Sequence, residues 1–108
     1  MAKKITDTVK VNADALEAKG ETYVLNLFVT GILPNSTRAV ININAICEKY
    51  LKDRYELEII DIYQQPYLAL TEDIIAVPLL VKKFPLPEQR MIGDLSNIEK
   101  VLKVLGLD

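Results

Sequence analysis

The chain has 108 residues, with 13 basic and 15 acidic side chains, a formal net charge of −2 and 50% hydrophobic residues. These values are typical of one small, mildly acidic globular domain and leave no room for a second full domain. The sequence contains one Cys and no His, which excludes an intrachain disulfide, a His-based metal site, a His-driven catalytic triad and a paired-cysteine redox centre.

No apolar run approaches the roughly 18 residues of a membrane-spanning helix. Residues 1–20 also lack the apolar stretch of a secretory signal, so we expect a cytoplasmic protein with no membrane partner. The same segment contains no aromatic residue and can bury little surface. We therefore expect a flexible N-terminal extension over residues 1–20 and a folded domain over residues 21–108.

The first half of the domain predicts a strand, a helix and a second strand. Residues 22–30 are dense in β-formers with two apolar faces, as in a central strand, and residues 55–63 form a similar run. Between them, a helix over residues 36–51, capped by Asn35 or Ser36, is indicated by a stripe at helical spacing: Ala39, Ile43, Ile46, Cys47 and Tyr50. A βαβ unit places its two strands parallel.

The second half predicts a short helix, two strands and a last helix. Pro66 suits the first turn of a helix that runs to about Ile74, and residues 79–83 form a third β-like run followed by residues 89–92. A capping box over residues 96–99 begins the last helix. Pro78, at the head of the third strand, is either an ordinary trans residue at a strand edge or a cis residue that fixes a turn.

Several kinds of binding chemistry are missing. Residues 31–36 contain one Gly and no Lys, so they form neither a P-loop nor a dinucleotide fingerprint, and we expect no nucleotide cofactor. Residues 48–73 hold seven acidic and three basic side chains, an arrangement that repels nucleic acid. The sequence offers no ligand set for a metal.

The remaining reactive side chains favour structural roles. Glu56 and Glu58 share one strand face and are better explained as solvated charges than as an acid–base pair. Asp61, inside an apolar run, is either hydrogen-bonded near a strand end or functional, and we favour the first. An enzyme that uses Cys47 or a bound thiol cofactor is the rival hypothesis, but a single mid-helix thiol lacks a resolving partner and an activating environment.

The order of elements resembles the thioredoxin fold, with Ala76-Val77-Pro78 where that fold keeps its cis-proline. The cysteine pair of thioredoxins is absent, because residues 31–36 stand in its place.

From Thr22 to Leu105 the chain is more closely similar to KaiB, a small clock protein of cyanobacteria with relatives in other bacteria. The matching motifs are Thr-Tyr-Val-Leu at 22–25, Gly31 with Pro34-Asn35-Ser36 and Arg38-Ala39, Ile60-Asp61, Ala76-x-Pro78, and Arg90-x-Ile92-Gly93-Asp94-Leu95-Ser96-Asn97.

This resemblance implies a non-enzymatic, metamorphic regulatory protein that docks on a KaiC-type ATPase, captures KaiA and competes with the thioredoxin-like sensor domain of the histidine kinase SasA. It also implies two folds, a monomeric thioredoxin-like βαβαββα form that binds KaiC and a homotetrameric ground state of order βαββααβ. The strand signal at residues 79–83 and the capping box at residues 96–99 favour the first, so we expect a thioredoxin-like α/β single domain.

The resemblance also assigns roles to particular residues. Three retained basic residues are expected to contact the partner: Arg38, Lys82 and Arg90. Gly93 and Asp94 fall in the fold-switch segment, and Pro78 is expected to follow a cis bond in the thioredoxin-like form.

Two positions depart from the clock proteins. Asp73 and Gln89 stand where those proteins carry basic residues, so the surface is more acidic, which indicates a divergent member of the family. A thioredoxin-fold signalling adaptor that binds a histidine kinase or another partner, without a clock role, is the alternative.

Overall fold

A computed structural model describes residues 22–31, 33–74 and 76–107, and the extension expected at residues 1–20 lies outside these ranges. The elements, in chain order, are β1 (Tyr23–Val29), α2 (Pro34–Tyr50), β2 (Tyr55–Asp61), α3 (Pro66–Thr71), β3 (Leu79–Phe84), β4 (Gln89–Ile92) and α4 (Ile98–Leu105). This order is βαβαββα, so the predicted thioredoxin-like α/β class is confirmed.

The four strands form one sheet in the order β2-β1-β3-β4. Strand β1 runs parallel to β2 and antiparallel to β3, and β4 returns antiparallel to β3. Leu27 of β1 lies opposite Ile59 of β2 and Leu80 of β3, so the most apolar strand is central. The parallel pair is the arrangement that the βαβ unit predicts.

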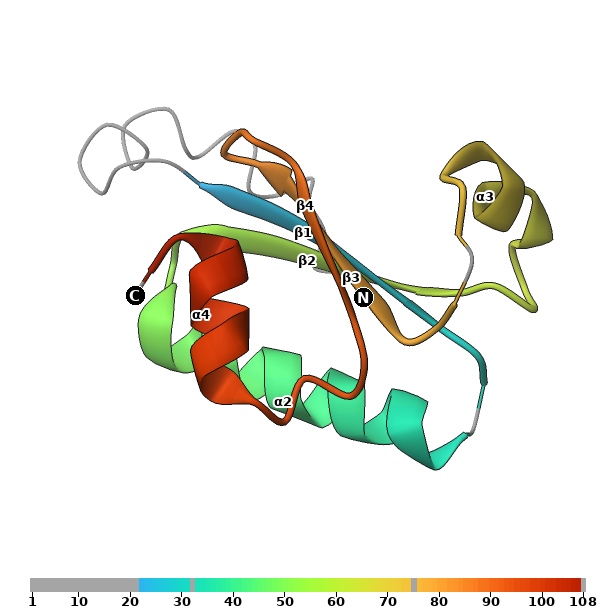
Figure 1. Ribbon diagram of the computed structural model, residues 1–108, viewed down its shortest axis with the longest axis horizontal. Helices are drawn as coiled ribbons and strands as arrows, with labels where there is room; N and C mark the ends of the chain where they lie inside the picture. Colours follow the sequence, from blue (N-terminus) through green and yellow to red (C-terminus); the bar gives the residue numbers. More distant parts are fainter. Residues whose placement is uncertain (1–21, 32, 75, 108) are drawn as a thin grey trace.

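Helices α2 and α4 pack on one face of the sheet and bury the main core (Figure 1). Tyr23 of β1 ties this core to the last helix, because its hydroxyl donates a buried hydrogen bond of 2.9 Å to the carbonyl of Leu105. The core is formed by Tyr23, Leu25, Leu27, Val29, Ala39, Ile43, Ile46, Cys47, Leu51, Leu80, Leu95, Val101 and Leu105.

A smaller apolar cluster covers the opposite face of the sheet, on the side where Figure 1 shows α3. Its buried members are Phe28, Ile60, Leu79 and Val81. Leu68 of α3 and the later Ile74 pack only at its edge, and no residue of α3 is fully buried. Fewer buried residues therefore gather on this face than on the face under α2 and α4.

The predicted caps of α2 are wrong. The helix begins at Pro34 after Leu33, which forms no side-chain cap. Proline suits this first position because its missing N–H would have no helical partner. The Ser36 hydroxyl instead accepts a hydrogen bond of 3.1 Å from the Thr30 backbone N–H, which closes the turn between β1 and α2.

Two other helix boundaries shift by one residue. Helix α4 is capped by Asn97, whose side chain accepts a hydrogen bond of 3.2 Å from the Lys100 backbone N–H, and not by Ser96. At the end of α2, Tyr50 belongs to the predicted apolar stripe but is 37% exposed, and the next residue, Leu51, is fully buried in its place.

Strand β2 and helix α3 both end earlier than predicted. The Asp61 carbonyl accepts hydrogen bonds of 3.0 Å from the N–H groups of Gln64 and Gln65, and its carboxylate accepts one of 2.9 Å from the Tyr63 N–H. This turn stops the strand before residue 63, and it gives Asp61 the hydrogen-bonded strand-end role that we favoured. Asp73 has a φ of 61°, a left-handed conformation that ends the helix before Ile74.

Candidate partner-binding surface

Arg38 and Asp94 join α2 to the loop between β4 and α4. The Arg38 Nε donates to Asp94 Oδ2 at 3.1 Å, and a second guanidinium nitrogen donates to the Asn35 side chain. The Asn42 side chain donates to the Asp94 carbonyl at 2.8 Å, and the Ser96 backbone N–H donates to Asp94 Oδ1 at 3.0 Å. Helix α2 therefore holds both the carboxylate and the backbone of Asp94.

The fold lowers the pKa of Asp94. Hydrogen bonds from Ser96, and then from Arg38, stabilise its charged form. The Arg38 side chain remains 53% exposed, so this residue is paired and still open to a partner.

The Asp94 carboxyl is expected to titrate below its ordinary pKa of about 3.9, and the Arg38→Gln variant is expected to move that pKa back toward the ordinary value. Carboxyl carbon NMR through an acid titration measures both. Because the folded-state pKa is lowered, the stability that this group contributes is complete above about pH 3.9 and is lost as the pH falls through the folded-state value.

Lys52→Gln is the matched control, since Lys52 lies beyond the other end of α2 and pairs with Glu48. An Asp94 pKa at or above the ordinary value in the unmodified chain would contradict the assignment.

Gly93, next to Asp94, connects the same loop to the head of β3. Its N–H donates to the carbonyl of Pro78 at 2.9 Å, and its φ of 127° is one that other residues rarely adopt. The Val77–Pro78 bond is cis. Gly93 of the predicted fold-switch segment and the proline therefore lie beside one another, just beyond the end of the β3–β4 pair.

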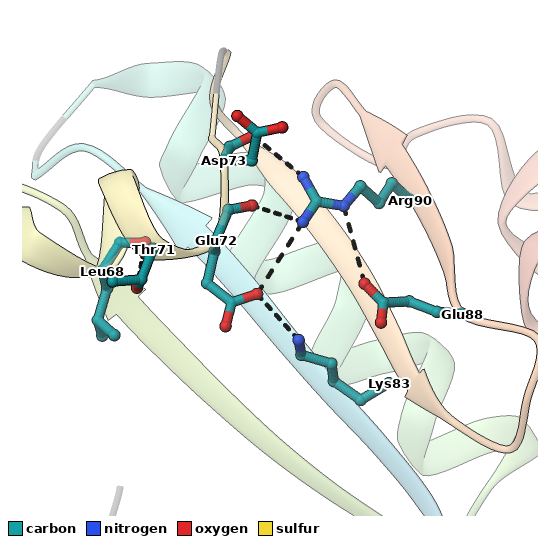
Figure 2. Close-up of polar contacts among 7 residues, drawn as sticks. All are labelled: Leu68, Thr71, Glu72, Asp73, Lys83, Glu88 and Arg90. Carbon is teal, nitrogen blue, oxygen red and sulfur yellow. Dashed lines mark hydrogen bonds and ion pairs between the residues drawn. The ribbon is translucent and has the colours of Figure 1, made fainter.

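Arg90 lies on the edge strand β4 (Figure 2). Its guanidinium donates to the backbone carbonyls of Glu72 at 2.6 Å and Asp73 at 3.2 Å, just after α3. The Glu72 carboxylate in turn accepts a hydrogen bond of 2.9 Å from Lys83. The sequence did not indicate these contacts, because 18 residues separate Arg90 from Glu72 and no local pattern joins them.

Lys82 does not lie where the resemblance suggests. The residue is 5% exposed and alternates along β3 with Leu80, which places it on the face that α2 and α4 cover. Lys82 therefore does not present a surface charge to a partner in this conformation. Of the three basic residues, Arg38 and Arg90 stay at the surface.

Large apolar side chains that the sequence did not single out are exposed on α3 and the loop before it. Tyr63 is 77% exposed, Tyr67 63% and Leu70 83%. Exposed apolar side chains that gather in one region mark sites of protein interaction. The available signal was the shortness of the predicted helix, which cannot bury apolar residues on all of its sides.

Within the described part of the chain, the side chains form no metal-binding group and the thiol is not activated. Over residues 22–31, 33–74 and 76–107, no three His, Cys, Asp or Glu side chains come together in a group that could hold a metal ion. Cys47 is fully buried, and burial together with the nearby Glu48 carboxylate raises the pKa of its thiol to about 12. None of the helices in the described ranges is long and apolar enough to cross a membrane.

The fold and these surfaces define a thioredoxin-like domain without the redox cysteine pair. Residues 26–107 match the KaiB domain, and the chain belongs to the KaiB family. This family consists of non-enzymatic regulatory proteins of the circadian clock.

Curated relatives agree with this assignment. The chain is 51% identical to the circadian clock oscillator protein KaiB of Thermosynechococcus vestitus, over 82% of this chain and 80% of the relative. It is 47% identical to KaiB of Synechococcus elongatus, over 82% of this chain and 84% of the relative.

The fold is similar to the N-terminal domain of Synechococcus elongatus SasA, with 28% identity, a TM-score of 0.58, and coverage of 82% of this chain and 87% of that domain. The Drosophila melanogaster thioredoxin Deadhead has the same fold at 13% identity and a TM-score of 0.65, over 86% of this chain and 87% of that one.

Proposed function

We propose that this chain is a non-catalytic regulatory partner that docks on a KaiC-type ATPase ring. One observation carries the proposal. A chain that is 47–51% identical to circadian clock oscillator proteins has the thioredoxin-like fold that it shares with the SasA N-terminal domain. Two proteins of one fold can use the same site on a common partner, and KaiA is a further candidate partner of the docked chain.

The contacts we assign to docking are Arg38 and the exposed side chains of the α3 region. Arg38 offers a half-exposed guanidinium, and Tyr67 and Leu70 offer apolar surface that the domain itself leaves uncovered. Charged groups at the rim of an interface steer association, while apolar groups at its centre supply most of the affinity.

Arg38→Glu is expected to weaken association with a KaiC-type ring by about tenfold or more, because it reverses a charge at the interface. Sedimentation velocity measures the affinity, because bound chain sediments with the ring and free chain sediments slowly. The measurement is made in ATP and in ADP. Lys52→Glu is the matched control, with the same charge change on a side chain that is 68% exposed. We expect it to bind as the unmodified chain does.

Absence of any complex with a ring in either nucleotide would overturn the proposal. Equal affinity of the Arg38→Glu and Lys52→Glu variants would remove Arg38 from the interface while leaving docking itself intact.

We further propose that the chain is metamorphic, with the described conformation as the monomeric docking form and a homotetrameric βαββααβ conformation as its alternative. The small number of contacts that hold β4 and the loop after it supports this proposal. Strand β4 is an exposed edge of four residues, and Gly93 and Asp94 are held there by a few polar contacts. Two packings of one sequence interconvert only when a few kcal/mol separate them.

A signalling adaptor that binds a histidine kinase without a clock role is the second candidate, favoured by the likeness to the SasA domain. It predicts binding to the kinase in the absence of a KaiC-type ring, whereas the first proposal predicts that the ring is required.

A further inference from the structure

Helix α3 is poorly held by its own residues. It has six residues, and none of them is buried. A helix this short is unstable in water without support from the rest of the fold. Tyr67 and Leu70 face solvent, and within the helix Leu68 packs against the apolar cluster below.

Polar contacts from the β3–β4 hairpin supply the missing support. Arg90 of β4 donates to the carbonyls of Glu72 and Asp73, which follow the last residue of α3. Glu72 is the C-cap of α3, where carbonyl groups lack helical partners and carry partial negative charge, so a guanidinium satisfies its carbonyl well. Asp73 is the next residue, and its carbonyl accepts the second hydrogen bond.

Two carboxylates complete the arrangement, as Figure 2 shows. The Glu72 carboxylate lies 2.9 Å from Lys83 Nζ and 3.9 Å from Arg90 Nη2, and the Glu88 carboxylate lies 3.9 Å from Arg90 Nε. The Arg90 side chain is 35% exposed, and its nitrogens are directed at groups of its own chain. Little of this guanidinium is left for a partner.

We propose that Arg90 is a positioning residue that caps the C-terminal end of α3 and holds it on the β3–β4 hairpin, and is not itself a contact for a partner. Its effect on docking passes through the exposed side chains of α3. Because Arg90 lies on the edge strand β4, the α3 surface exists only while β4 is paired with β3. The part of this inference that concerns docking rests on the proposed function, and the capping part does not.

The capping is tested on the full-length free chain by NMR, from the ¹³Cα secondary shifts of residues 66–71. Arg90→Gln is expected to reduce these shifts by about half or more, since an unsupported helix of this length is mostly unfolded. Arg90→Lys keeps a charged donor but lacks the planar guanidinium that reaches two carbonyls at once. Its secondary shifts are expected to lie between those of Arg90→Gln and those of the unmodified chain. Arg38→Gln removes a different surface guanidinium and is expected to leave α3 unchanged.

Unchanged shifts at residues 66–71 in Arg90→Gln would overturn the proposal. An equal reduction of the secondary shifts over β1 would also overturn it, because Arg90 would then stabilise the whole domain and not α3 in particular. A free chain without strand shifts at residues 79–84 and 89–92 would do the same, since Lys83 and Arg90 would no longer lie on paired strands.

A double-mutant cycle with a KaiC-type ring separates positioning from direct contact. If Arg90 acts through α3, Arg90→Gln weakens binding in the unmodified chain and has little further effect in a chain that already carries Leu70→Ser. If Arg90 touches the ring, the two effects add and the positioning role is wrong. The shift measurement needs no ring, so failure of docking and failure of the cap give different results.

Discussion

Phe28→Ala is expected to lower the free energy of unfolding by about 3–5 kcal/mol, the usual cost of deleting a buried aromatic ring. Phe28 is fully buried in the cluster beneath α3 and lies opposite Ile60 of β2 and Leu79 of β3. A domain of this kind is stable by only about 5–15 kcal/mol, so the variant approaches the limit of folding. Urea denaturation followed by circular dichroism gives the difference.

The matched control is Ile41→Ala, on the solvent side of α2, where the side chain is 61% exposed. Its effect is expected to stay within about 0.5 kcal/mol, as for most surface substitutions. A similar loss in both variants would mean that the cluster around Phe28 is not a second core.

Cys47 is expected to react with a disulfide reagent at pH 8 at least about 100-fold more slowly in the folded chain than in the same chain unfolded in urea. A thiol with the ordinary pKa of about 8.5 is roughly one quarter thiolate at this pH, whereas the fold raises the pKa of Cys47 to about 12. The side chain is also fully buried, so access adds to the effect.

A disulfide reagent that releases a coloured thiol when it reacts gives this rate from the change in absorbance. The same chain unfolded in urea is the control. Comparable rates in the two states would show that Cys47 is exposed and activated. That result would reopen the hypothesis of a thiol-dependent enzyme, which the burial of Cys47 and the membership of the KaiB family both contradict.

Local pattern in the sequence was enough to predict the elements and their order. A run of β-forming residues located β1, and a stripe at helical spacing located α2, because propensity and periodicity are local properties of the chain. Details set by single hydrogen bonds were not predicted. The Ser36 hydroxyl accepts a hydrogen bond from the Thr30 backbone N–H and not from an N–H group of its own helix. The composition of the segment does not predict which of these N–H groups the hydroxyl binds.

The candidate surface was only partly predictable, for a different reason. The resemblance to KaiB pointed to Arg38 and Arg90 but also to Lys82, which the sheet turns toward the core side. The partners of Arg90 lie 17 and 18 residues away, on the far side of a strand. Contacts of this kind depend on where the β3–β4 hairpin lies relative to α3. The periodicity of the sequence does not predict that placement.

Competition for a KaiC-type ring tests the central claim most directly. A fluorescently labelled SasA N-terminal domain is bound to the ring, this chain is added, and the anisotropy of the label is followed. Since the two proteins share a fold, we predict that the chain displaces the labelled domain and that the anisotropy falls to the value of the free domain. An anisotropy that stays at the bound value, with the chain in large excess, would contradict docking at a shared site.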